Sequence, residues 1–259
     1  MRRRSPSTLD EGDQRALLRE AALLLPDPAR RRLLRGAITV GGLAMATGCS
    51  VTDSDSAQTL LTRMSRFNDR VQGWLFDPNK LAPEYTRAEI TQPFPFNAYY
   101  GESEVREVNG DTWRLAVSGR VAKPRNLTLE DLRAMPQRDQ ITHHICVEGW
   151  SAIGRWGGPL LADVLLAVGA DTSARYVAFK CADDYHTSID MATALHQQTF
   201  VALTYDGQTL PAKYGFPAKV RMPTKLGYKN PKHVMELVVT NEYPGGYWED
   251  QGYNWFGGS

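Results

Sequence analysis

The sequence contains few cysteines, almost no excess of charge and none of the commonest catalytic motifs. Its three cysteines, Cys49, Cys146 and Cys181, are too few and too scattered for a disulfide framework or a CxxC metal site. Thirty Lys and Arg residues against 29 Asp and Glu residues leave a net charge of +1, so we expect no basic surface for nucleic acid. The lack of GxGxxG, Walker, GxSxG and HExxH motifs argues against the usual nucleotide-binding, serine hydrolase and zinc protease sites.

The 259 residues are 42% apolar and 23% charged, which is enough to bury a sizeable core. Strand-like alternations outnumber helical spacings and are not regularly separated by them, so we expect an α+β fold with mixed sheets and short helices. Strands are predicted over 140–147, 176–181 and 234–240, and helices over 60–75 and 160–168. Prolines and aromatic residues between 76 and 102 predict an extended arm.

The first 49 residues follow the order of a bacterial export signal. A basic cluster, Arg-Arg-Arg-Leu-Leu-Arg at 30–35, precedes a weakly apolar run at 36–45 and then small residues. About ten apolar residues are too few to cross roughly 30 Å of hydrocarbon, so this run is not a membrane span. The cluster resembles the twin-arginine consensus, which implies export of a folded protein. An amphipathic N-terminal helix with a basic edge is the alternative.

Cys49 closes the sequence Ala-Thr-Gly-Cys, which resembles a lipoprotein box. A cysteine in such a box becomes the acylated N-terminus, and two or three acyl chains would hold the protein on a membrane. Ordinary signal-peptidase cleavage nearby is the alternative. In either case we expect residues 50–93 to form a tether, an N-terminal helix and an arm, and residues 94–259 to form the functional domain.

Cys146 ends a predicted strand and is followed by Glu148 and by a glycine-rich segment that contains Arg155 and that we interpret as a loop. A thiol in such a place is a nucleophile, a soft ligand for a metal, or simply a buried free cysteine. The preceding His143 and His144 point to opposite faces of a strand, so they cannot easily ligate one metal.

The C-terminal half contains a cluster of lysines and an aromatic tail. Lys219, Lys225, Lys229 and Lys232 crowd a glycine-containing segment, which predicts either a phosphate site or a solvated basic face. The aromatic residues at 244–256 are expected to seal an edge of the core, or else to line the mouth of a site or dock a redox partner.

Five motifs occur in one order along the chain. They are Cys146-Val-Glu-Gly-Trp-Ser151, Trp156-Gly-Gly-Pro-Leu160, Tyr176-Val-Ala-Phe179, Leu210-Pro211 and Pro223-Thr-Lys-Leu-Gly-Tyr-Lys229 with Lys232. In this order they resemble the molybdopterin domain of the sulfite oxidase superfamily, over roughly residues 94–240. The match is closest to its branch of exported catalytic subunits of bacterial methionine-sulfoxide reductases. The resemblance implies a sulfite-oxidase-type molybdopterin-binding fold and one molybdenum–molybdopterin cofactor per chain.

The resemblance also implies roles for individual residues. Cys146 matches the thiolate that binds molybdenum, and Glu148 and Arg155 are the further candidates for catalysis. The positions that match cofactor-binding residues are Asn97, Tyr100, Gly101, Cys181, Tyr214, Lys219, Asn230, Pro231 and Lys232. Three of them depart from the pattern, because Cys181 stands where the related reductase has a threonine, Tyr214 replaces a His or Asn, and Lys219 cannot reproduce the planar fork of an arginine. Sulfite oxidases neutralise their oxyanion substrate with several arginines, and near Cys146 only Arg155 is a candidate, so sulfite is a weaker expectation than an uncharged S-oxide.

The implied function is an oxidoreductase of the periplasm or cell envelope that transfers an oxygen atom with two electrons, with methionine sulfoxide as a candidate substrate. The chain has no haem-binding CxxCH and no flavin motif, so electrons are expected from a membrane cytochrome of b type or a soluble carrier. No residues remain for the dimerisation domain of sulfite oxidases, and we expect a monomer. The alternatives are a non-catalytic pterin-binding lipoprotein, a sulfite dehydrogenase, and a metal-free thiol enzyme using Cys146 with His144.

Overall fold

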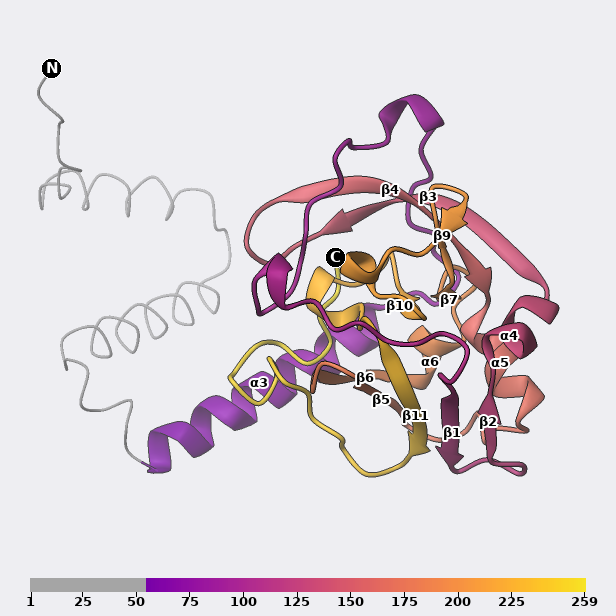
Figure 1. Cartoon of the computed structure of the whole chain (residues 1–259). Helices are drawn as coiled ribbons and strands as arrows, with labels where there is room; N and C mark the ends of the chain where they lie inside the picture. The colour runs from indigo at the N-terminus through magenta and orange to yellow at the C-terminus, as the bar shows by residue number, and fades with distance from the viewer. Residues whose placement is uncertain (1–54) are drawn as a thin grey trace, which may run out of the picture. The chain divides into compact units, whose positions relative to one another are not determined.

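The computed structural model describes residues 55–259 (Figure 1). The predicted export signal and the predicted acylation site at Cys49 lie outside the described residues. Residues 64–259 form one compact unit. Within residues 55–259, no helix is long and apolar enough to cross a bilayer.

Short helices and strands alternate irregularly, which confirms the predicted α+β class. The helices are α3 (Asp55–Leu75), α4 (Leu129–Ala134), α5 (Leu161–Ala167) and α6 (Met191–Ala194), with 3₁₀ turns at Arg87–Glu89, Glu102–Glu104, Ala212–Tyr214 and Gly227–Lys229. The strands are β1 (Leu115–Gly119), β2 (Arg125–Leu127), β3 (Gln137–Ile145), β4 (Ser151–Pro159), β5 (Tyr176–Cys181), β6 (His186–Asp190), β7 (Phe200–Ala202), β8 (Thr204–Tyr205), β9 (Gln208–Thr209), β10 (Lys219–Arg221) and β11 (Val234–Thr240).

Three sheets share these strands. A five-stranded sheet has the order β2-β1-β11-β5-β6, in which only β1 and β11 run parallel, and a four-stranded sheet has the order β3-β4-β8-β9. The short strands β7 and β10 pair with each other, and Figure 1 shows them between the long β3–β4 hairpin and the five-stranded sheet. The main core lies against the five-stranded sheet, and a second, mostly aromatic cluster lies against β4.

The glycine-rich segment after Cys146 is strand β4, so its interpretation as a loop is wrong. All nine residues of β4 pair with β3, from Ser151 opposite Ile145 to Pro159 opposite Gln137. The glycines allow a close crossing, because a Cβ on Gly158 would lie 1.9 Å from the Val201 carbonyl oxygen. Glycine here serves a contact between strands rather than a flexible turn.

The segment between α3 and β1 is the extended arm that its prolines and aromatic residues predict. Its backbone runs beside the β3–β4 hairpin, where Tyr85 N donates to Ile141 O and Thr91 N donates to Ile153 O, each at 2.9 Å. The arm then delivers Asn97 to the end of β3, because Asn97 Nδ2 donates to His144 Nε2 at 3.1 Å.

Candidate functional site

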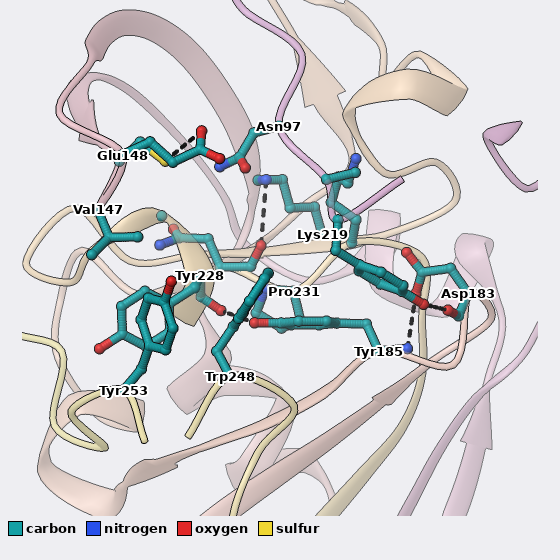
Figure 2. Close-up of a pocket in the computed structure, with 16 residues that line it drawn as sticks. Asn97, Val147, Glu148, Asp183, Tyr185, Lys219, Tyr228, Pro231, Trp248 and Tyr253 are labelled. Atoms are coloured by element: carbon teal, nitrogen blue, oxygen red, sulfur yellow. Dashed lines mark hydrogen bonds between the residues drawn. The ribbon is translucent and has the colours of Figure 1, made fainter. Parts of the chain in front are cut away.

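A pocket opens beside the turn that joins β3 to β4 (Figure 2). Many of the predicted site residues line it: Asn97, Cys146, Glu148, Lys219, Asn230, Pro231 and Lys232. They come from the arm, the β3–β4 turn, β10 and the segment before β11, which are far apart in the sequence. Figure 2 shows Glu148 and Asn97 on one side of the pocket and Asp183 and Tyr185 on the other.

Cys146 lies at the first position of a tight turn. Its backbone N–H donates to Trp150 O at 2.9 Å, and its Sγ donates to Glu148 Oε2 at 3.6 Å. Trp150 Nε1 donates to the same carboxylate oxygen at 2.9 Å, which holds the Glu148 carboxylate beside the sulfur. Burial is the main cause that raises the pKa of the Cys146 thiol, so the thiolate needs a positive partner to form at neutral pH.

Two lysines line the pocket without a carboxylate partner. Lys219 Nζ donates to Asn230 O at 3.4 Å, and Lys232 Nζ donates to Lys213 O at 3.2 Å. Among residues 55–259, neither amine lies within salt-bridge distance of an Asp or Glu. Burial lowers the pKa of Lys219 well below its ordinary value and that of Lys232 to about 8. Buried amines that no carboxylate contacts favour the binding of an anion at this wall of the pocket.

Arg221 supports this wall and was missed by the sequence analysis. Its guanidinium is buried and donates to Asn230 Oδ1 at 2.9 Å and to His143 O at 2.6 Å, and Asn230 Oδ1 also accepts from Met222 N at 2.7 Å. These bonds hold Asn230 where it lines the pocket. A signal was present, because Lys219 and Arg221 are two residues apart on one strand and so share a face.

His144 is buried behind Asn97 and does not act on the thiol. Its ring is held by Asn97, and the hydrogen-bond partner of the Cys146 sulfur is Glu148. Burial, followed by the nearby charges of Arg221 and Lys219, lowers the pKa of His144, so the ring is neutral. A Cβ at Gly227 would lie 2.8 Å from His144 Nε2, which requires glycine at this point of the pocket wall. The geometry therefore argues against a metal-free Cys146–His144 couple.

Asp183 forms the acidic side of the pocket and was also missed. It is buried, and its Oδ2 accepts from Tyr100 Oη at 2.8 Å, while its backbone carbonyl accepts from Tyr99. Tyr185 continues this wall and donates from Oη to Tyr228 O at 2.5 Å. The negative charge of Asp183 favours the protonated forms of Lys219 and Lys232 without contacting either amine.

Several predicted site residues do not line the pocket. Tyr100 acts behind Asp183, and Gly101 is an exposed residue that caps a 3₁₀ turn. Tyr214 belongs to the aromatic cluster and donates from Oη to Phe94 O at 2.8 Å. Cys181 borders a separate hollow at β5 and β6, and Arg155 Nε is paired with Asp139 Oδ1 at 2.7 Å. Their roles in cofactor binding or catalysis stay predictions.

The lysine cluster is not a solvated basic face, because all four of its members are buried. Lys225 Nζ donates to Phe256 O at 2.9 Å, and Lys229 forms an ion pair with Glu249. Both partners belong to the C-terminal tail. The same tail places Trp248 and Tyr253 at the pocket, while Trp255 and Phe256 are buried. The tail therefore seals the core and also lines the site.

Comparisons with known proteins agree with this geometry. Residues 102–248 match the family described as the oxidoreductase molybdopterin binding domain. The chain is 66% identical to the "Putative protein-methionine-sulfoxide reductase subunit YedZ1" of Azospira oryzae, over 90% of this chain and 88% of the relative. It is 30% identical to the protein-methionine-sulfoxide reductase catalytic subunit MsrP of Ralstonia nicotianae, over 68% of this chain and 61% of the relative.

A solved structure shares the fold. The sulfane dehydrogenase SoxCD of Paracoccus pantotrophus superposes with a TM-score of 0.50 at 20% identity, over 53% of this chain and 40% of that chain. The pocket with its buried thiol and unpaired lysines, the family match and the similarity to these relatives lead to one assignment. The chain belongs to the molybdopterin-binding oxidoreductases of the sulfite oxidase superfamily, whose cofactor is molybdenum–molybdopterin.

Proposed function

We propose that this protein is an exported catalytic subunit that reduces uncharged S-oxides, such as methionine sulfoxide, with electrons from a separate redox protein in the membrane. The observation that carries the proposal is a buried thiol, Cys146, in the same pocket as two buried lysines that have no carboxylate partner. The names of the relatives support the substrate class and a function within a larger reductase.

The residues of the pocket fit a molybdenum–molybdopterin cofactor. Cys146 offers a soft sulfur ligand, and its raised pKa means that a metal cation is the kind of partner that would stabilise its thiolate. Lys219 and Lys232 would hold the phosphate of the cofactor, with Asn230 and Pro231 completing that wall, and Asn97 also lines the pocket. The bound cofactor supplies two-electron oxygen-atom transfer, and the other contributions come from the protein.

Glu148 would accept the proton of the Cys146 thiol, which is the proposed ligand of molybdenum. Its Oε2 already accepts the Cys146 S–H, so it is placed to receive that proton when the thiol becomes a thiolate. The bond from Trp150 Nε1 keeps the carboxylate in this position. The overall reaction R₂SO + 2e⁻ + 2H⁺ → R₂S + H₂O consumes two protons, and Glu148 would pass protons into the pocket.

The charge at the thiol favours a neutral substrate over sulfite. Glu148 Oε2 lies 3.6 Å from the Cys146 sulfur, and once Glu148 has passed on its proton the ionised carboxylate would repel an incoming oxyanion. A sulfoxide carries no net charge, and the apolar parts of its carrier would meet Val147, Trp248 and Tyr253 in the pocket. This distribution favours S-oxide reduction over the alternative of sulfite dehydrogenation.

The test begins with molybdenum analysis of the purified protein, followed by turnover of methionine sulfoxide and of sulfite with reduced and oxidised dyes. We expect molybdenum, sulfoxide reduction and little sulfite oxidation. Molybdenum without turnover would instead identify a non-catalytic pterin-binding protein, and faster sulfite oxidation would identify a dehydrogenase.

Two cysteine variants form a matched pair for the ligand. We expect Cys146→Ser to lower turnover by about 100-fold or more and to change the molybdenum paramagnetic resonance spectrum, because a hydroxyl is a harder ligand than a thiolate. Cys181→Ser should change the turnover and the spectrum only mildly, since Cys181 does not line the pocket. If Cys146→Ser kept the parental spectrum and rate, the ligand assignment would be wrong.

We further propose twin-arginine export to the cell envelope and acylation at Cys49. Replacing Arg30 and Arg31 by Lys should leave the protein in the cytoplasm, whereas efficient export of that variant would indicate the general secretory route. Globomycin, which blocks processing of lipoproteins, should leave a larger precursor. Normal maturation in its presence would show that Cys49 is not acylated.

A further inference from the structure

Helix α3 packs on the protein through its polar face. Asp69 Oδ1 accepts from Asn254 Nδ2 at 2.8 Å and from Phe256 N at 3.3 Å. One turn further on, a Cβ at Gly73 would lie 3.8 Å from the Phe256 ring, and the Phe76 ring lies 5.6 Å from the same ring. The face that carries Asp69, Gly73 and Phe76 is therefore the one that contacts the C-terminal tail.

The opposite face of α3 carries a continuous apolar stripe that is exposed. Its members are Met64, Phe67, Val71, Trp74 and Leu75, with Leu60 and Leu61 preceding them at the same spacing. Phe67 is 60% exposed and Trp74 is 83% exposed. On an α-helix the positions 64, 67, 71, 74 and 75 share one face, so these side chains form a single surface rather than scattered contacts.

A basic row borders the stripe. Arg63, Arg66 and Arg70 are exposed and lie at helical spacing on one flank, and Asp69 is the only acidic residue between 59 and 76. Within the described part of the chain, none of these arginines lies in salt-bridge distance of a carboxylate. Arg66 and Arg70 border a hollow with Tyr243 and Trp255, and the Arg66 guanidinium lies 5.8 Å above the Tyr243 ring.

We propose that α3 docks on the surface of an anionic lipid bilayer, with the apolar stripe in the acyl boundary and the arginine row at the phosphates. A strongly amphipathic helix with basic residues beside its apolar face and with tryptophan and phenylalanine in that face is the type that lies in a membrane interface. These arginines have no carboxylate partner among the described residues, which favours anionic headgroups over a neutral apolar partner.

The position of α3 in the chain agrees with docking on a bilayer. Residues 50–54 separate Cys49 from the first residue of α3, and five residues span at most about 18 Å when extended. An acyl anchor on Cys49 would therefore keep α3 close to the bilayer. The proposal itself depends on the stripe and the arginine row, and it is independent of the proposed reaction.

The test measures binding of the full chain to vesicles of phosphatidylcholine, with or without phosphatidylglycerol. Every sample carries Cys49→Ser so that no acyl chain contributes. We expect the parent to bind the anionic vesicles. The double variant Phe67→Ser/Trp74→Ser should have a partition coefficient about tenfold or more lower. The double variant Arg66→Gln/Arg70→Gln should lose the preference for anionic over neutral vesicles. Leu166→Ser is the matched control, because Leu166 is 79% exposed on α5 and should leave binding unchanged.

A second measurement separates α3 from the leader. Trp74 is the first tryptophan of the chain, so insertion of the preceding residues adds no tryptophan signal. Vesicles with brominated acyl chains should quench fluorescence in the parent and much less in Trp74→Phe, which keeps an apolar side chain and should still bind. Equal quenching in the two proteins would overturn the proposal, as would equal vesicle binding by the parent and Phe67→Ser/Trp74→Ser. A dimer in solution that Phe67→Ser/Trp74→Ser dissociates would assign the stripe to a second copy instead, and would also overturn it.

Discussion

Two pairs of buried lysines in one short segment differ in what faces them. Lys225 and Lys229 meet partners from the protein, since Lys225 Nζ lies 3.6 Å from Asp190 Oδ2 and Lys229 is paired with Glu249. Lys219 and Lys232 meet only backbone carbonyl oxygens as hydrogen-bond acceptors.

The difference separates two lysines that contact carboxylates from two lysines that we propose to bind the cofactor. A buried amine with a carboxylate in contact is partly compensated, so it can hold the C-terminal tail in place without any ligand, although burial still lowers the pKa of Lys225 to about 7. A buried amine without one carries an unfavourable charge until an anion enters the pocket. Position in the sequence does not separate the two pairs, because Lys225 and Lys229 lie between Lys219 and Lys232.

The largest effect on stability is expected when the ion pair between Lys229 and Glu249 is broken. Glu249→Gln removes the charge that faces Lys229 and also weakens the bond that Thr187 Oγ1 donates to Glu249 Oε1 at 2.6 Å. We expect the free energy of unfolding to fall by about 3 kcal/mol, as measured by denaturant titration. The control is Glu249→Gln/Lys229→Met, which removes both charges and should recover much of the loss. A single variant as stable as the parent would show that this pair does not hold the tail.

A smaller and different effect is expected at the unpaired amines. Lys219→Met should weaken retention of the cofactor by about tenfold or more, because a charge-assisted bond to phosphate is lost. The cofactor-free protein should be no less stable, since a buried cation without a partner is removed. Pterin content after gel filtration and denaturant titration test the two halves of this prediction. Lys225→Met, the matched variant of the other pair, should show the reverse pattern.

The smallest effect is a dependence of stability on pH. Burial lowers the pKa of Lys232 to about 8, against about 10.5 for an unfolded lysine. Between these values the unfolded chain binds more protons, so the stability of the cofactor-free protein should rise as pH rises from 8 to 10.5. Below pH 8 Lys232 is protonated in both the folded and the unfolded protein, so the energetic cost of burying its charge should be constant.

Comparison with Lys232→Met isolates this contribution from other groups. The parent should gain on the order of 1–3 kcal/mol relative to the variant across the window. The gain should shrink in the cofactor-loaded protein, because a bound phosphate stabilises the charged amine. Parallel pH profiles for parent and variant in the cofactor-free state would show that Lys232 is not desolvated.

Local signals were sufficient for much of the fold. Strands β5 and β11 have the bounds that their alternation predicts, and Thr128 caps α4 through a local bond that its hydroxyl accepts from Asp131 N. These elements depend on side-chain spacing and on contacts within a few residues. Strand β4 was missed because its glycines suggested a loop. Glycine at 158 is instead required by the close approach of the Val201 carbonyl, which is distant in the sequence.

Many polar residues of the pocket were predictable, but Asp183 was not, and for the aromatic tail the sequence left the lining of a site only as one alternative. Cys146, Asn97 and the Asn-Pro-Lys sequence at 230–232 belong to recognisable motifs, and all of them line the pocket. Trp248 and Tyr253 reach it only because the tail is anchored by Lys225 and Lys229. No local pattern shows which of many aromatic side chains will lie at a pocket.

The sequence by itself determined the α+β class, the family and the thiol at the strand end, because each depends on residue types in a short order. Only the tertiary structure decided which lysines have partners, that Arg221 holds Asn230, and that α3 turns its apolar stripe away from the protein. Charge compensation and burial depend on what other segments bring near a residue. Those neighbours are set by the packing of the whole chain and not by spacing along it.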